Sequence, residues 1–132
     1  LTPETQRKWG KMSVDQVLAH LNVAYDLTFT PEKFPKPSFI AKFLLSKFVK
    51  PKITNEIPYK QSLPTSPAFI IADERNFEEE KAKLIGNIQR VQQLGREAFE
   101  GKENINFGKM TAQCWNNMFA KHLNHHLEQF GV

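Results

Sequence analysis

The sequence has one cysteine and no long apolar run, and each shortage excludes a class of protein. A single cysteine, Cys114, cannot form a disulfide within the chain and suits a reducing compartment, so we expect a cytoplasmic protein. No stretch approaches the roughly 20 apolar residues of a membrane span. No secretory signal is visible, although the chain opens at Leu1 rather than at a methionine.

Arginine is also scarce, because only Arg7, Arg75, Arg90 and Arg96 stand among the 18 basic residues. The net charge of +4 therefore rests mainly on lysines, which are scattered apart from a modest concentration at residues 33–60. Phosphate recognition depends more on arginine than this sequence allows, so we expect no nucleic-acid partner. Neither a G-x-S-x-G motif nor a glycine-rich phosphate loop is present, which leaves serine-nucleophile and phosphate-loop chemistry without support.

What is present is the composition of an ordinary globular domain. The 132 residues are 40% hydrophobic and 24% charged, enough to build one domain with a real core. Phenylalanine is unusually frequent, with 11 residues, so we expect the core to be rich in aromatic side chains.

Capping signals predict where the first helix begins. Ser13 is followed three residues later by Gln16, which is the pattern of a capping box. Apolar residues then recur with helical spacing, and we expect a helix from about residue 14 to 29, ended by Pro31.

A second, shorter helix is predicted from Ser38 to Lys50, ended by Pro51. Its phenylalanines and other apolar residues fall on one side and its lysines on another. A basic amphipathic helix of this kind can lie on a membrane surface. We favour an ordinary helix of the domain whose lysines are solvated, and we therefore expect no membrane partner.

A proline-rich connection follows, from Pro51 to Arg75. A loop of this length inside a compact domain is uncommon unless it covers a site or contributes packing, and residues 63–69 can supply such a cover.

Two further helices complete the chain. Asn76 is expected to cap a long helix that ends before Gly101, and Thr111 to cap a last helix from about residue 112 to 129. The fold class we predict is all-α, with a long proline-rich crossover.

Three of the four histidines fall within five residues near the C-terminus. At about 100° per residue, His122 and His126 lie within about 20° of the centre of the apolar stripe that includes Trp115 and Phe119. Two inward imidazoles one turn apart are a common helical way to bind one metal ion. His20, on the first predicted helix, can supply the third ligand. Three imidazoles suit a divalent transition metal, with zinc or nickel favoured.

Alternatives to this ligand set remain open in the sequence. His125 lies at the edge of the stripe, where we expect it to support a ligand, although His122 and His125 are also spaced to act as a pair. His20 taken alone is equally typical of a half-buried histidine bonded to a neighbour. Three carboxylates share the histidine-bearing helices without occupying a face that compels their choice: Asp15, Asp26 and Glu128. Because ligating rings must be neutral, we expect metal affinity to fall below about pH 6.5.

Several segments together resemble one branch of the DinB-like superfamily of metal-binding four-helix bundles, a branch catalogued as a domain of unknown function. The resemblance spans most of the chain, and its most specific part is His20 combined with His122-x-x-x-His126. The other segments that carry it are Trp9-Gly10-Lys11-Met12-Ser13, Pro64-Thr65-Ser66-Pro67, Phe107-Gly108-Lys109-Met110-Thr111 and Gln129-Phe130-Gly131-Val132.

The resemblance implies a DinB-like four-helix bundle and a divalent metal held by His20, His122 and His126. Relatives of known activity include thiol-dependent transferases and isomerases, which suggests metal activation of a small thiol. The resemblance therefore implies a metal-dependent enzyme of the thiol-transferase or hydrolase type. The alternative is a non-catalytic module, either stabilised by its metal or forming a homodimer through its aromatic helices.

Two departures from the family pattern matter. Relatives commonly carry His-Pro shortly before the second aromatic-Gly-Lys motif, where this chain has Asn104-Ile105-Asn106. The first helix of the bundle also normally precedes the Trp-Gly-Lys-Met segment, and nothing in this sequence fills that place. We therefore expect residues 1–132 to form a single bundle domain whose first helix lies upstream of Leu1. Otherwise the helix from Ser38 to Lys50 must take over that packing position.

Overall fold

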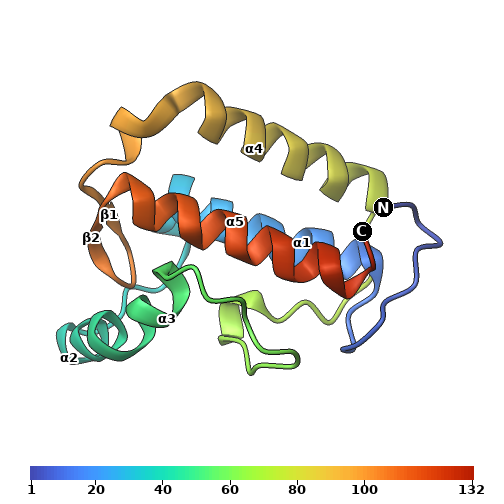
Figure 1. Ribbon diagram of the computed structural model, residues 1–132, viewed down its shortest axis with the longest axis horizontal. Coiled ribbons are helices and arrows are strands. Elements are labelled where there is room, and N and C mark those ends of the chain that lie inside the picture. The colour runs from blue at the N-terminus through green and yellow to red at the C-terminus, as the bar shows by residue number, and fades with distance from the viewer.

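Three long helices dominate the structure, a computed structural model that describes residues 1–132 (Figure 1). These helices are α1 (Val14–Phe29), α4 (Phe77–Phe99) and α5 (Ala112–Gln129). Shorter elements connect them: a 3-10 turn (Pro31–Lys33), α2 (Phe39–Leu44), a π-helical turn η2 (Leu45–Val49), α3 (Lys50–Thr54), a second 3-10 turn η3 (Pro67–Phe69), and strands β1 (Lys102–Asn104) and β2 (Gly108–Met110).

The long helices begin and end where local signals predict. The Ser13 amide donates to the Gln16 side chain at 3.0 Å, the side chain of Asn76 accepts from Glu79 N at 3.1 Å, and that of Thr111 accepts from Cys114 N at 3.2 Å. Each of these bonds satisfies a backbone N–H that would otherwise lack a partner at the start of its helix or just before it. The predicted bounds of all three long helices are confirmed, but α4 is not one continuous helix, because Gly95 has a non-helical backbone (φ +73°) and kinks it.

The predicted stop at Pro51 is wrong. Helical structure continues through η2 and α3 to Thr54, and Pro51 lies in the first turn of α3. A proline is tolerated in a first turn, where its missing N–H costs no hydrogen bond. Nor are all the lysines of this segment solvated, because Lys42 forms an ion pair with Glu103 at 2.6 Å and Lys50 donates to the carbonyl of Lys109 at 3.0 Å.

A small hairpin replaces the loop expected between the last two helices, so the fold is mostly helical rather than all-α. β1 and β2 pair antiparallel, with Lys102 opposite Met110 and Asn104 opposite Gly108. The side-chain oxygen of Asn104 accepts from the amides of Asn106 and Phe107 at 2.9 and 3.2 Å and so closes the turn. The strands span only three residues each, too few for a periodic signal in the sequence.

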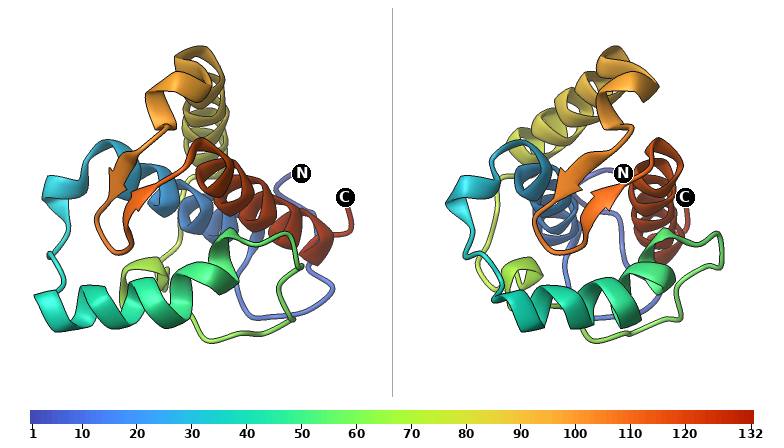
Figure 2. Two further views of the ribbon diagram at one scale, coloured as in Figure 1. Left: turned by 60° about the vertical axis from the view of Figure 1, so that its left-hand side comes forward. Right: turned by 90° about the vertical axis from the view of Figure 1, so that its left-hand side faces the viewer.

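The core is aromatic, as expected, and α1 forms its centre. Every residue of α1 from Val17 to Tyr25 is buried, against α4 on one side and α5 on another (Figure 2). Tyr25 stacks on Phe119 with ring centroids 4.7 Å apart, and Phe99 meets Trp115 edge-on at 5.6 Å. None of the helices combines the length and apolarity that crossing a membrane requires.

A buried polar contact that no sequence pattern predicts joins α1 to α4. Asn22 is 1% exposed and lies among apolar residues of α1. Its amide nitrogen donates to the backbone carbonyl and the carboxylate of Glu80 at 3.0 and 2.8 Å, and its oxygen accepts from Asn87 at 3.1 Å. All of the strong hydrogen-bonding atoms of this side chain are therefore used inside the protein.

Replacing Asn22 with alanine should lower the free energy of unfolding by about 1–3 kcal/mol, because Glu80 and Asn87 lose a buried partner. The matched control is Asn116→Ala on the exposed side of α5, which should change stability by less than about 0.5 kcal/mol. Urea denaturation of the two variants measures the difference. Equal effects would show that the Asn22 contacts contribute nothing specific.

Candidate metal centre

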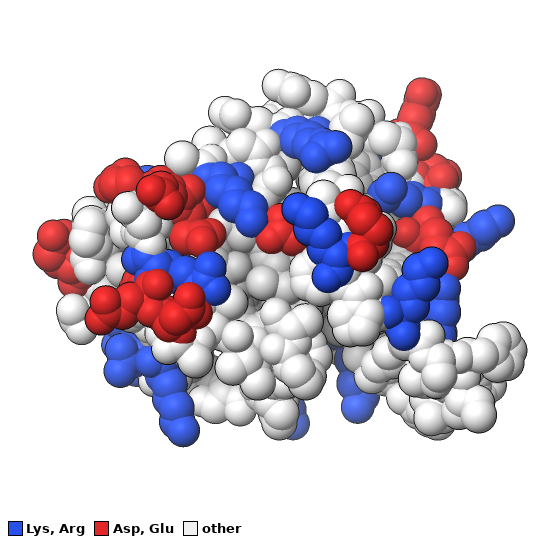
Figure 3. Space-filling model, turned by 180° about the vertical axis from the view of Figure 1, so that it is seen from behind, with Lys and Arg blue, Asp and Glu red and all other residues white.

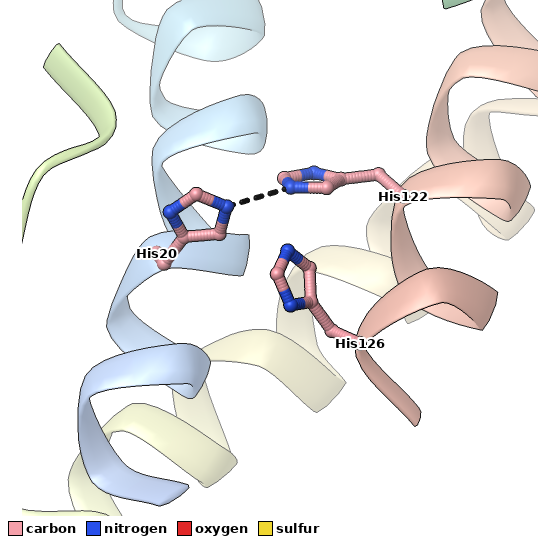
Figure 4. A group of neighbouring side chains, drawn as sticks. All are labelled: His20, His122 and His126. Atoms are coloured by element: carbon pink, nitrogen blue, oxygen red, sulfur yellow. Dashed lines mark hydrogen bonds between the residues drawn. The ribbon is translucent and has the colours of Figure 1, made fainter. Parts of the chain in front are cut away.

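Three histidines from two helices meet in the core. His20 projects from α1, and His122 and His126 project from successive turns of α5 toward it (Figure 4). One nitrogen from each ring can be chosen so that the three atoms lie within 4.8 Å of one another. The group follows directly from local structure, because positions four apart on a helix share a face and α1 packs against that face of α5.

His20 is oriented by the crossover. Its Nδ1 lies 2.8 Å from the backbone carbonyl of Phe69, so Nδ1 carries the proton and donates it. In the neutral ring Nε2 then has a free lone pair, and this atom is directed at His122. The Phe69 ring also packs edge-on against both imidazoles, with centroids 5.3 Å from His20 and 5.8 Å from His122.

His126 is oriented by the opposite end of the chain. Its Nδ1 lies 2.7 Å from Oε1 of Gln129, and Nε2 of Gln129 donates to the carbonyl of Trp9 at 2.8 Å. The amide orientation is consistent, because Gln129 donates to Trp9 and accepts from His126. Gly10 has φ +81° and lies so close to this amide that a Cβ there would collide with Nε2. The Trp9-Gly10 motif thus gives Gln129 its position, and Gln129 orients His126.

His122 completes the group through the nitrogen that faces His20, at an Nε2–Nε2 distance of 2.9 Å. Since Nε2 of His20 has no proton in the neutral ring, Nε2 of His122 is the donor in this hydrogen bond. The centroid of the His122 ring lies 4.9 Å from that of His20 and 5.0 Å from that of His126.

Burial keeps these rings neutral. Loss of solvent lowers the pKa of His126 from 6.5 to about 4, although its hydrogen bond to Gln129 partly opposes the shift. Burial also lowers the pKa of His20, against a smaller opposing effect of the Phe69 carbonyl. The pKa of His122 lies well below its usual value because burial is reinforced by the neighbouring histidines. Neutral imidazole is the form that binds metals.

His125 lies apart from this group. Its ring meets Trp9 and Tyr59 edge-on, at centroid distances of 6.1 and 5.6 Å, and touches His126 at 5.0 Å. Partial burial lowers its pKa, with a smaller opposing effect of Glu128. The structure therefore groups His122 with His126 rather than with His125, and it places His125 beside the ligand candidates, where it contacts His126.

The carboxylates left open by the sequence do not join the histidines. Asp15 accepts hydrogen bonds from the Ser13 hydroxyl and the Arg75 amide, and Asp26 forms an ion pair with Lys83 at 2.7 Å. The histidine group contains neither a carboxylate nor a thiol.

Sequence reasoning missed two residues that support the site. Gln129 follows His126 by three positions, the spacing of neighbours on a helix surface, so its contact with that ring could have been proposed. Phe69 acts through its backbone carbonyl, which no side-chain pattern reveals. It does lie in the 63–69 segment that we expected to cover a site.

The donor set fits a divalent transition metal. Metal-ligating histidines usually donate their second ring N–H to a carbonyl or carboxylate, which fixes the tautomer and the ring orientation. Here Phe69 and Gln129 accept those protons from His20 and His126 and leave Nε2 available in both rings. The three imidazole nitrogens could thus hold one ion of the zinc, nickel or cobalt type.

Comparison with known proteins gave one match. The family model described as "Protein of unknown function (DUF1569)" matches residues 1–131. Neither the curated proteins nor the solved structures include a match to this chain.

Replacing Gln129 with alanine should weaken metal binding by about 10- to 100-fold, because His126 loses the acceptor that fixes its tautomer. Competition with a chromogenic chelator measures the affinity. Glu128→Ala, at the exposed neighbouring position, is the control and should leave the affinity nearly unchanged. If both variants bind metal as tightly as the parent protein, Gln129 does not orient the ligand.

The lowered pKa values correct the expected pH dependence. Three ordinary histidines would lose about a thousandfold in metal affinity by pH 5.5, since each would be about 90% protonated there. In this protein burial lowers the pKa of all three rings, that of His126 to about 4, so the loss by pH 5.5 should be much smaller than a thousandfold. Zinc titrations between pH 7.5 and 5 test this. A steep loss that begins at pH 6.5 would contradict it.

Proposed function

This chain belongs to the family described as "Protein of unknown function (DUF1569)", and we propose that it is a divalent-metal-binding protein whose metal serves catalysis. The observation that carries the proposal is the convergence of His20, His122 and His126, with Phe69 and Gln129 behind two of the rings. Buried imidazoles need partners, and few arrangements other than a metal site would gather three of them.

His20, His122 and His126 would hold the ion. A divalent ion bound by neutral imidazoles supplies Lewis-acid chemistry, because it lowers the pKa of a water molecule or thiol that it binds. The chain's contribution is to keep the three rings neutral by burial and to hold two of them in one tautomer.

Two features support a catalytic rather than a purely structural ion. The group supplies three nitrogens and no fourth protein donor, and three protein ligands are typical of catalytic zinc sites. The Phe69 ring covers His20 and His122, and it lies on a crossover with few regular elements, which suits a wall that shields a site from water.

The reaction class we propose is thiol transfer or hydrolysis. It rests on the resemblance to DinB-like proteins, and the three long helices and the crossover that covers the histidines are consistent with a DinB-like bundle. In a thiol-dependent reaction, the side chains around the histidines would position a small thiol and exclude water. Imidazole ligands suit zinc and nickel, which are the metals we propose.

The alternative function, a non-catalytic domain stabilised by its metal, is favoured by a different aspect of the same site. The three rings and their partners join α1, α5, the crossover and the Trp9-Gly10 segment, so an ion there would also fasten four separate parts of the chain.

Metal content and ligand response distinguish the two functions. Protein purified without an affinity tag should contain about one equivalent of metal by elemental analysis, and His20→Ala, His122→Ala and His126→Ala should each remove most of it. His125→Ala should retain it. Equal losses in all four variants would reject the proposed ligand set.

Cobalt-substituted protein should then show new charge-transfer absorption when a small thiol such as 2-mercaptoethanol is added, provided that the ion has an open position. The His125→Ala protein, loaded with cobalt, is the control and should respond like the parent. Full metal binding without any response to thiols or other small ligands would favour the structural role.

A further inference from the structure

The segment from α2 to α3 is turned with its most apolar side toward solvent. Five large apolar residues form this side, here called the phenylalanine face, and they are Phe39, Ile40, Phe43, Leu44 and Phe48. Their exposed fractions are 89%, 70%, 57%, 47% and 57% in that order. An uncharged protrusion stands where α2 lies, at the lower right of Figure 3, and basic side chains lie beside it. Apolar patches of this kind on a protein usually mark an interaction surface.

The π-helical turn η2 keeps the phenylalanine face continuous. In a π-helix the hydrogen bonds connect residues five apart, so Phe48 falls above Phe43, whereas a regular helix would place position 47 there. Nζ of Lys47 lies 6.0 Å from the centroid of the Phe43 ring and 5.5 Å from that of the Phe48 ring, so this lysine borders both rings. Such turns are frequent at functional sites.

The opposite side of the segment is fastened to the protein. Leu45, Val49 and Ile53 pack against the core, while Lys42 and Lys50 are bound to the β1–β2 hairpin. At the end of α3, Lys121 of α5 donates to the carbonyl of Lys52 at 2.6 Å, and Asn117 donates to that of Thr54 at 2.9 Å. The segment therefore cannot bury its phenylalanines by rotating unless all these contacts break.

The charge around the phenylalanine face has one sign. Residues 33–55 contain six lysines and no acidic residue. Lys33, Lys36, Lys47 and Lys52 are exposed, while Lys42 is the one whose charge is paired, with Glu103. An apolar helix face bordered by exposed lysines is complementary to a surface that is apolar within and negative at its edge.

Although the sequence alone favours no membrane partner, the exposure of these residues changes that expectation, and we propose that the phenylalanine face binds the surface of an anionic lipid bilayer, with the rings inserted at the boundary of the acyl chains and the lysines against the headgroups. The segment from α2 to α3 lies along one edge of the molecule (Figure 2). The phenylalanine face consists of aromatic and aliphatic side chains that need no hydrogen-bonding partner. Such a face suits the deformable apolar layer formed by lipid acyl chains.

A second copy of the chain fits this face less well. In a twofold-symmetric contact each phenylalanine face would meet its own copy, and the lysines of both copies would be brought together. Like charges that meet at an interface oppose association, whereas anionic headgroups would neutralise them.

The test is sedimentation of the protein with vesicles of phosphatidylcholine containing about 30% phosphatidylserine. The protein should associate with these vesicles, and less with phosphatidylcholine alone. The variant Phe39→Ser/Phe43→Ser should reduce association at least about tenfold, because two inserted rings are lost. Lys36→Glu/Lys47→Glu should abolish the preference for phosphatidylserine. Both variants change exposed residues, and far-UV circular dichroism verifies that they remain folded.

Ile85→Ser/Ile88→Ser is the matched control. These isoleucines of α4 are 47% and 38% exposed and lie outside the phenylalanine face, so their replacement should leave association unchanged. Absence of association in the parent protein, or equal association of the parent and the Phe39→Ser/Phe43→Ser variant, would overturn the proposal. So would a dimer in lipid-free sedimentation velocity that this variant dissociates, because the face would then belong to a second copy.

Discussion

The burial of three imidazole rings side by side is the constraint on which much of this structure depends. A buried ring nitrogen without a partner costs free energy, and each partner here comes from a different part of the chain. The crossover supplies the Phe69 carbonyl to His20, and Gln129, held by Trp9, supplies its amide to His126. The crossover and the Trp9 segment have little regular structure of their own, and their hydrogen bonds to the histidine group hold them in place. The same hydrogen bonds orient the histidine rings.

A feature of the fold or of the site could be predicted from the sequence where residues within about one helical turn determine it. Ser13, Asn76 and Thr111 predicted the starts of the long helices because caps act within one turn, and the spacing of His122 and His126 predicted a shared face for the same reason. The hairpin at 102–110 depends on an Asn104 turn between strands too short to show a period. The orientation of α2 and the role of Phe69 depend on tertiary contacts, which no local pattern encodes.

The core and the phenylalanine face differ in how they use aromatic side chains. In the core, Tyr25, Phe99, Trp115 and Phe119 pack on one another and are buried. On α2 and η2 the phenylalanines face outward with Lys47 above them, where burial would need a partner from outside the chain. A high phenylalanine content therefore does not by itself predict a larger core. α3 continues from α2 and η2 and packs on α5, which carries His122 and His126. The phenylalanine face and the candidate metal centre are therefore connected through α5.

The last turn of α5 has a further consequence for how the molecule moves. Terminal turns of helices are usually the first to fray, because their final carbonyls lack partners within the helix. Here the Gln129 carbonyl accepts from the Lys8 amide at 2.7 Å, while its side chain bridges Trp9 and His126. Opening of this turn would free a histidine and the Lys8–Trp9 segment at once. Ligation of the histidines should therefore slow amide hydrogen exchange around residues 8 and 129 together.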